Sequence, residues 1–190
     1  MRLSRKFYSR DTKTIAKDLL GKVLVHKTGE GTVKGKIVET EAYLGEDDPG
    51  AKGNRNINTA PKSLLKDPGH AFVYFTYGNH WMLNIIAKNP GILGAVLIRA
   101  LEPVEGIKLM KRRRDKGDIH DLADGPGKLT QALGIDKNHD GLDLTKSNDL
   151  FIEDSDEKPK IFTTTRIGLS KGGDLPLRFY IKDSEFVSRK

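Results

Sequence analysis

Two glutamates and a tyrosine alternate along one short stretch of the chain, and their types and spacing could support acid–base chemistry. Residues 37–43 read IVETEAY, a run that predicts a β-strand. Because side chains alternate between the two faces of a strand, we expect Glu39, Glu41 and Tyr43 on one face. If that face is solvated, the pattern carries no chemistry. If it is partly buried, one carboxylate could act as a general base that activates water.

Aromatic residues cluster in a second stretch, residues 70–86, whose pattern predicts a β-hairpin with its turn at residues 77–80. Glycine and asparagine in that turn tolerate the positive φ angles that tight hairpins require. Tyr74 and Tyr77 are three residues apart, so a regular strand would place them on opposite faces, with Tyr74 facing a cavity. Tyr77 would project from the tip, where an exposed ring could wedge between stacked bases.

Other residues of this hairpin have simpler structural interpretations. Phe72 and Phe75 are expected to fill the core, as aromatic strand residues often do. Asn84 interrupts an apolar run, and a buried amide at that position would need hydrogen-bond partners. Asn84 could therefore be a satisfied core group or a reader of a base edge.

Signals for phosphate and metal binding are weak. Residues 125–128 read GPGK, open an expected helix, and could present backbone N–H groups and a cation to phosphate. They do not form a P-loop, because its glycine spacing and its Lys-Ser/Thr ending are absent. The five histidines have no metal-ligand spacing, so we predict no metal site.

Composition places the chain among globular proteins. Its 190 residues fit one domain, 1–190, and 36% hydrophobic with 31% charged residues is typical of a folded protein. The absence of cysteine excludes disulfides, thiol nucleophiles and Cys-ligated metals. With no apolar run long enough for a transmembrane helix and no signal-peptide pattern, we expect a cytoplasmic protein without a membrane partner. The net charge of +7 is compatible with nucleic acid as a partner, although many basic proteins bind none.

Alternation, capping residues and helix breakers predict the elements that must position these groups. Expected helices begin at 11–12, at 102–103 and at 126, and expected strands cover 22–27, 35–43, 95–99, 161–166 and 177–182 besides the hairpin at 70–86. Residues 45–68 are rich in polar residues, glycine and proline and predict a long loop. We therefore expect an α+β fold with a mostly antiparallel, curved sheet, flanking helices and a protruding β-hairpin.

Several motifs in a fixed order give the chain a specific resemblance that runs nearly from end to end. They are DLLG at 18–21, IVETEAYLG at 37–45, PGHAFVYFTYG at 68–78, Leu83-Asn84, LIRALEPVEG at 97–106, GPGKLTQALGI at 125–135 and PLRFYI at 176–181. In these motifs the chain resembles the alkyladenine (3-methyladenine) DNA glycosylases of the mammalian type, a family with bacterial members. The resemblance implies a monomeric enzyme that needs no cofactor. It would flip damaged purines out of double-stranded DNA and hydrolyse their glycosidic bond in base excision repair.

The resemblance also implies roles for the residues of the acidic strand. Glu41 would be the general base that activates water. Arg99 and a backbone carbonyl near Ile167 would help to hold that water. This chemistry suits an alkylated purine, because a cationic base leaves without strong acid catalysis while a carboxylate stabilises the oxocarbenium-like sugar.

Base recognition would fall to the aromatic residues. By the same resemblance, Tyr43 and Tyr74 would sandwich the flipped base, Asn84 would line the pocket, and Tyr77 would fill the vacated stack from the minor groove. An electron-poor base between aromatic walls gains about 0.5–2 kcal/mol from cation–π attraction. Further candidate phosphate contacts are Lys62, Gly127 and Lys128.

The sequence departs from the family pattern where the base is read. The family usually has a histidine eleven residues after the catalytic glutamate, and Lys52 stands there in this chain. A long cation in the pocket could repel cationic adducts and change base preference. The loop motif Thr-Pro-Arg-Asn is replaced by residues 59–63, TAPKS, and Asn79 stands where methionine is common.

Two alternatives to a water-activating glycosylase remain open at this point. The first is a protein that binds distorted or damaged nucleic acid without cleaving the glycosidic bond, although Glu41 and Arg99 would serve no purpose in it. The second is a glycosylase in which the Lys52 amine attacks the sugar, a reaction that requires a depressed lysine pKa. Borohydride trapping of a covalent adduct would distinguish the second alternative.

Overall fold

The structure is a computed structural model that describes residues 1–46, 48–51, 58, 60–88 and 93–189. Its strands are β1 (Val23–Thr28), β2 (Gly31–Tyr43), β3 (Ala71–Thr76), β4 (His80–Ile86), β5 (Ala95–Glu105), β6 (Leu150–Glu153), β7 (Ile161–Thr164) and β8 (Arg178–Ile181). Its α-helices are α1 (Arg5–Tyr8), α2 (Thr12–Asp18), α3 (Ile107–Arg114) and α4 (Pro126–Leu133), and two 3-10 helices cover Lys62–Leu65 and Lys137–His139. The α+β class is confirmed.

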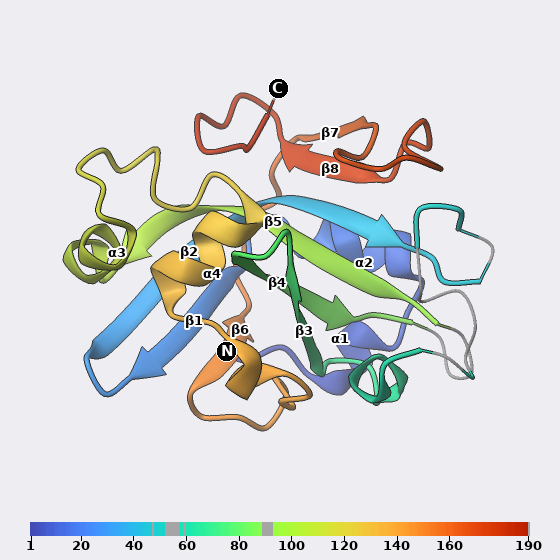
Figure 1. The fold of residues 1–190 in the computed structure, drawn as a ribbon, viewed down its shortest axis with the longest axis horizontal. Coiled ribbons are helices and arrows are strands. Elements are labelled where there is room, and N and C mark those ends of the chain that lie inside the picture. The colour runs from blue at the N-terminus through green and yellow to red at the C-terminus, as the bar shows by residue number, and fades with distance from the viewer. Residues whose placement is uncertain (47, 52–57, 59, 89–92, 190) are drawn as a thin grey trace.

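All these strands belong to one curled antiparallel sheet (Figure 1). Its main path runs β3-β4-β5-β2-β1-β6, while β8 pairs with β2 and β7 pairs with β8. Helix α4 packs against β4 and β5, and α2 packs against β2. In the part of the chain described, no helix has the length and apolar character needed to cross a bilayer.

Strand β2 has neighbours on both edges along most of its length. One edge pairs with β5, while the other pairs with β1 near the start of the strand and with β8 at residues 39–41. Register shifts interrupt the pairing with β5 around Glu39. The expected acidic strand is thus hydrogen-bonded along both edges, and its two glutamates are buried.

The sequence located most elements and misplaced several boundaries; β2, for example, begins at Gly31 and not at residue 35. Helix α2 begins after Asp11, whose carboxylate accepts a hydrogen bond from the Thr14 amide, and α4 ends at Gly134, as expected. The expected helix at Glu102-Pro103 was wrong, because β5 continues to Glu105 and α3 begins after Gly106. Pro103 lies opposite Gly35 next to a register shift, where the missing N–H is tolerated. Helix α1 and strand β6 were not predicted.

Strands β3 and β4 form a hairpin within the expected residues 70–86, but the turn is shorter than the expected 77–80. Thr76 pairs with His80, and the three residues between them make the turn. Tyr77 and Gly78 both have positive φ, at 53° and 73°. For tyrosine this left-handed conformation is uncommon and costs energy, so the turn holds Tyr77 in a direction that a regular strand would not give it.

Candidate active site

Glu41 is fully buried on β2, and three groups contact its carboxylate. The Tyr43 hydroxyl donates to Oε2 at 2.8 Å, and the Ile167 amide donates to Oε1 at 2.8 Å. The Nη1 atom of Arg99 lies 3.3 Å from Oε1. Both carboxylate oxygens therefore have a donor, and the side chain is fixed in one orientation.

Glu39 lies two residues earlier and is also fully buried. Its Oε1 accepts hydrogen bonds from Arg99 Nε at 2.9 Å, Arg178 Nη1 at 3.1 Å and Ser188 Oγ at 2.9 Å. The Ser188 amide donates to Oε2 at 2.6 Å. Two carboxylates and two guanidinium groups thus form one buried ionic cluster in which Arg99 bridges Glu39 and Glu41. The expectation that both glutamates point the same way holds.

Arg99 keeps its charge in this cluster. Burial lowers the pKa of its guanidinium, but the negative charges of Glu41 and Glu39 outweigh that effect, and the net shift is upward. Tyr43 keeps its proton, since burial and the neighbouring Glu41 charge raise the pKa of its hydroxyl far above the ordinary value. The tyrosine therefore acts as a neutral donor, and the arginine as a fixed cation.

The two tyrosines expected as walls lie on one cavity of about 410 Å³, which Tyr43, Tyr74 and Asn84 help to line. Asn84 is buried, and its Nδ2 donates to the Phe72 carbonyl at 3.4 Å. The amide therefore has a partner in the protein and also faces the cavity, so the two interpretations of Asn84 are compatible. A cavity of this size suits a flat aromatic ligand such as a purine.

An adjoining cavity of about 250 Å³ reaches the donors of Glu41. Tyr43, Tyr74 and Tyr77 line both cavities, and Arg99 and Ile167 line the second one. The residues that carry these three contacting groups therefore all line this space. The resemblance implied a backbone carbonyl near Ile167 as a water ligand, whereas the contact in the structure is its amide on Glu41.

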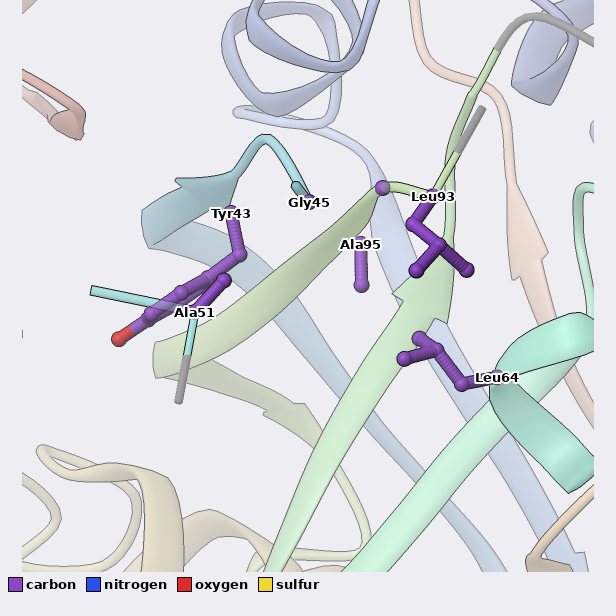
Figure 2. Close-up of a pocket in the computed structure, with 7 residues that line it drawn as sticks. Tyr43, Gly45, Ala51, Leu64, Leu93 and Ala95 are labelled. Atoms are coloured by element: carbon purple, nitrogen blue, oxygen red, sulfur yellow. The ribbon is translucent and has the colours of Figure 1, made fainter. Parts of the chain in front are cut away.

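Figure 2 shows a small apolar recess beside Tyr43. Ala51 lies near the Tyr43 ring, and Leu64 and Leu93 close the other side. The recess holds only about 10 Å³, room for about one small group. Lys52 follows Ala51 in the chain, but it lies outside the described residues, so its expected place in the base pocket stays a prediction.

Two expectations about the hairpin were wrong. Tyr74 and Tyr77 do not diverge, because the left-handed turn brings Tyr77 onto the cavity that Tyr74 also lines. Phe75 does not fill the core: it is 51% exposed and contacts Trp81 at a ring-centroid distance of 4.8 Å. It shares a strand face with the buried Val73, but the hairpin tip extends beyond the core at that point. Phe72 is buried, as expected.

The candidate phosphate contacts differ in their surroundings. Lys62 is exposed at the start of a 3-10 helix. Gly127 packs so closely on His80 that a Cβ atom would come within 2.6 Å of the imidazole ring. The Lys128 ammonium pairs with Asp124 at 2.8 Å. Phosphate binding at these positions stays a prediction.

Comparison with known proteins adds an independent observation. The model of the family described as Methylpurine-DNA glycosylase (MPG) matches residues 6–185, almost the whole chain. The chain belongs to this family. It is therefore a DNA glycosylase, a hydrolase of DNA repair that acts on DNA, and the resemblance drawn from the sequence motifs is confirmed.

Relatives of similar length carry the same name. A protein of Methanoculleus marisnigri named "Putative 3-methyladenine DNA glycosylase" is 47% identical over 195 residues, and the match covers 100% of both chains. Proteins of the same name from Prosthecochloris aestuarii and Clostridium perfringens are 45% and 44% identical. The match covers 99% of this chain and 91% of the Prosthecochloris protein, and 100% of both chains in the Clostridium case.

Sequence reasoning missed several residues that build this candidate site. Arg178 and Ser188 hold Glu39, and Asp48 and Arg166 form a buried ion pair behind Tyr43. Arg178 lies in the motif PLRFYI that supported the family resemblance, so a charged residue in an apolar strand was an available signal. The other partners are distant in sequence and depend on the fold.

Proposed function

We propose that this protein excises alkylated or deaminated purines from double-stranded DNA, and that Glu41 activates the attacking water. The observation that carries the proposal is the geometry of one carboxylate: Glu41 is buried, and the three residues that hold it line a cavity with aromatic walls. The names of the relatives support 3-methyladenine as one of the substrates.

Recognition begins with a base that leaves the helix. A damaged base unstacks at lower cost than a normal one, which adds selectivity before any chemistry. In the cavity, Tyr43 and Tyr74 offer aromatic faces, and a cationic alkylpurine gains about 0.5–2 kcal/mol from such contact. Asn84 offers an amide that can read the base edge. Tyr77 is 77% exposed at the hairpin tip and can occupy the space left in the stack.

Hydrolysis then needs little more than an oriented carboxylate and water. An alkylated purine is a good leaving group, because it already carries positive charge. As the glycosidic bond stretches, the sugar becomes oxocarbenium-like, and the Glu41 carboxylate stabilises this charge while it directs water to the anomeric carbon. Arg99 keeps Glu41 in place and is itself held by Glu39. We propose that one monomer carries the complete site.

Base release under single-turnover conditions tests this proposal. Duplexes carrying hypoxanthine, ethenoadenine or an alkylated purine are incubated with the wild type and with Glu41→Gln. We expect the variant to lose about 10²–10⁴-fold in rate, the usual worth of a general base, while it still binds the duplexes. Glu185→Gln, a change in a surface glutamate whose side chain is 78% exposed, is the matched control.

Two other outcomes would replace the proposal. Intact binding without release of any lesion by the wild type would favour a protein that recognises damage without cleaving. A covalent adduct trapped by borohydride in the wild type and absent in Lys52→Ala would favour attack by the lysine amine. The ranking of lesions in Lys52→His, which restores the residue usual in the family, measures how Lys52 affects base preference.

A further inference from the structure

Behind Tyr43 lies an ion pair that has no solvent-exposed atoms in either side chain. Arg166 Nη1 donates to Asp48 Oδ2 at 2.6 Å, Nη2 donates to Oδ1 at 2.6 Å, and both side chains are 0% exposed. The Leu44 and Gly50 amides also donate to the Asp48 carboxylate, at 3.0 and 2.8 Å. Burial raises the pKa of Asp48, but the hydrogen bonds from Arg166 and the two amides lower it by more, and the net shift is downward. The pair is therefore charged at neutral pH.

Arg166 connects three segments of the chain. Its Nη1 donates to the Ala42 carbonyl at 3.0 Å, and its Nη2 donates to the Gly172 carbonyl at 2.9 Å. Its guanidinium carbon lies 4.8 Å from the centre of the Tyr43 ring. The end of β2, the loop around Asp48 and residues 166–172 are therefore joined by a single side chain. Neither Arg166 nor Asp48 is among the described residues that line the two cavities.

Such a pair is a costly way to gain stability alone. Removing two charges from water takes several kcal/mol for each ion, and apolar residues of similar size often stabilise a fold equally well. A bidentate pair has one strongly preferred geometry, however, and it therefore fixes the position of every group that is hydrogen-bonded to it. The position of the pair indicates which groups those are.

We propose that Arg166 and Asp48 are positioning residues that set the two hydrogen-bond donors of Glu41. Tyr43 is held from behind by the guanidinium, and its hydroxyl donates to Oε2. Ile167 follows Arg166 directly, and its amide donates to Oε1. One ion pair therefore fixes a donor to each oxygen of the carboxylate. This inference rests on the proposed role of Glu41 as the general base.

The pair also sets the charge behind the base-stacking face of Tyr43. Arg166 alone would place a cation against one face of the ring and weaken the attraction of the other face for a cationic base. Asp48 neutralises that charge at a distance of one hydrogen bond. Loss of the Asp48 charge should therefore reduce the excision of cationic alkylpurines more than the excision of neutral hypoxanthine.

The test compares Asp48→Asn, Arg166→Lys and Arg166→Met with the wild type. Single-turnover excision is measured on an alkylpurine duplex and a hypoxanthine duplex, and binding is measured on a duplex with an uncleavable abasic analogue. The control is Asp143→Asn, which breaks the Arg5–Asp143 ion pair elsewhere in the protein. Thermal melting and circular dichroism establish that each variant is folded.

We expect excision by Arg166→Met to fall by up to about 100-fold, the effect of a misplacement of about 1 Å in a catalytic group. Binding of the abasic duplex should change little, and Arg166→Lys should recover part of the rate. Asp48→Asn should show the larger loss on the alkylpurine.

Other results would overturn the inference. These are folded variants with wild-type rates on both lesions, or losses of rate that only follow losses of binding. If the single variants do not fold, the neutral double variant Asp48→Asn/Arg166→Gln removes both charges together, and wild-type rates on both lesions in it would also refute the inference. Failure of the proposed function is distinguishable, because Glu41→Gln would then excise bases as well as the wild type.

Discussion

The end of β2 and the tip of the β3–β4 hairpin face the same space and are built in opposite ways. Near the end of β2, the carboxylates of Glu39, Glu41 and Asp48 are buried, and each has an arginine partner. At the hairpin tip, Tyr74 and Tyr77 are 38% and 77% exposed. The first region is an ionic cluster, and the second is an aromatic surface.

The difference indicates that the ionic cluster orients Glu41, whereas the aromatic surface binds DNA. A buried charge that loses its partner is costly, so the ionic cluster resists movement and keeps Glu41 in one orientation. An exposed ring has free area for a base to stack on, and it gains energy only when DNA arrives. Changes in the first region should therefore affect stability and rate, whereas changes in the second should affect the DNA complex.

Glu39→Gln should have the largest effect on the ionic cluster. It leaves Arg178 and Arg99 without their shared carboxylate, and breaking a buried pair in this way costs about 3–5 kcal/mol. Urea unfolding measures the loss. Glu102→Gln, which removes a surface partner of Lys36, is the control and should cost no more than about 1 kcal/mol. Equal losses in the two variants would contradict the claim that the buried ionic cluster contributes more to stability than a surface ion pair.

Tyr77→Ala should have an intermediate effect that is confined to the DNA complex. Loss of stacking against bases should weaken the free energy of DNA binding by about 1–3 kcal/mol. The free protein should unfold at the same temperature as the wild type or at a slightly higher one. Fluorescence of 2-aminopurine beside the lesion reports flipping. The slope of affinity against salt should be the same in both proteins, because the substitution removes no positive charge. Unchanged flipping would exclude the wedge role.

The smallest expected effect is a loss of folding stability at acidic pH. Hydrogen bonds hold the pKa of Asp48 below its unfolded value of about 3.8 despite burial. The stabilisation is therefore complete above pH 4 and is lost as the pH falls through the lower, folded value, by about 1.4 kcal/mol for each unit between the two. The stability gap between the wild type and Asp48→Asn should narrow as the pH falls below about 4. A constant gap would show that Asp48 is not charged in the fold.

The sequence predicted the parts of this site that local patterns encode. Alternation placed Glu39, Glu41 and Tyr43 together, and glycine at the turn located the hairpin. Alternation could not predict the burial of Glu41, which depends on β8 closing the second edge of β2. Ser188 contacts Glu39 across 149 positions of sequence, and no local signal encodes such a contact.

The errors arose where the tertiary structure differed from what residue type or regular strand geometry would give locally. The expectation that Tyr74 and Tyr77 lie on opposite faces assumed a regular strand, whereas Tyr77 has a positive φ and both side chains line the same cavities. Tyr77 is nevertheless exposed at the hairpin tip, as expected. Phe75 was assigned to the core by its residue type, although the hairpin extends beyond the core there. The helix expected at Pro103 was favoured by proline at a first turn, and pairing with β2 outweighed that preference.

The positive φ of Tyr77 implies a conflict between thermal stability and base excision. Asparagine adopts the left-handed conformation at lower cost than tyrosine, so Tyr77→Asn should melt at a higher temperature. The same substitution removes the exposed ring. Selection of variants for heat resistance alone would therefore tend to discard this tyrosine, and a laboratory that evolves the protein should screen for base release in every round.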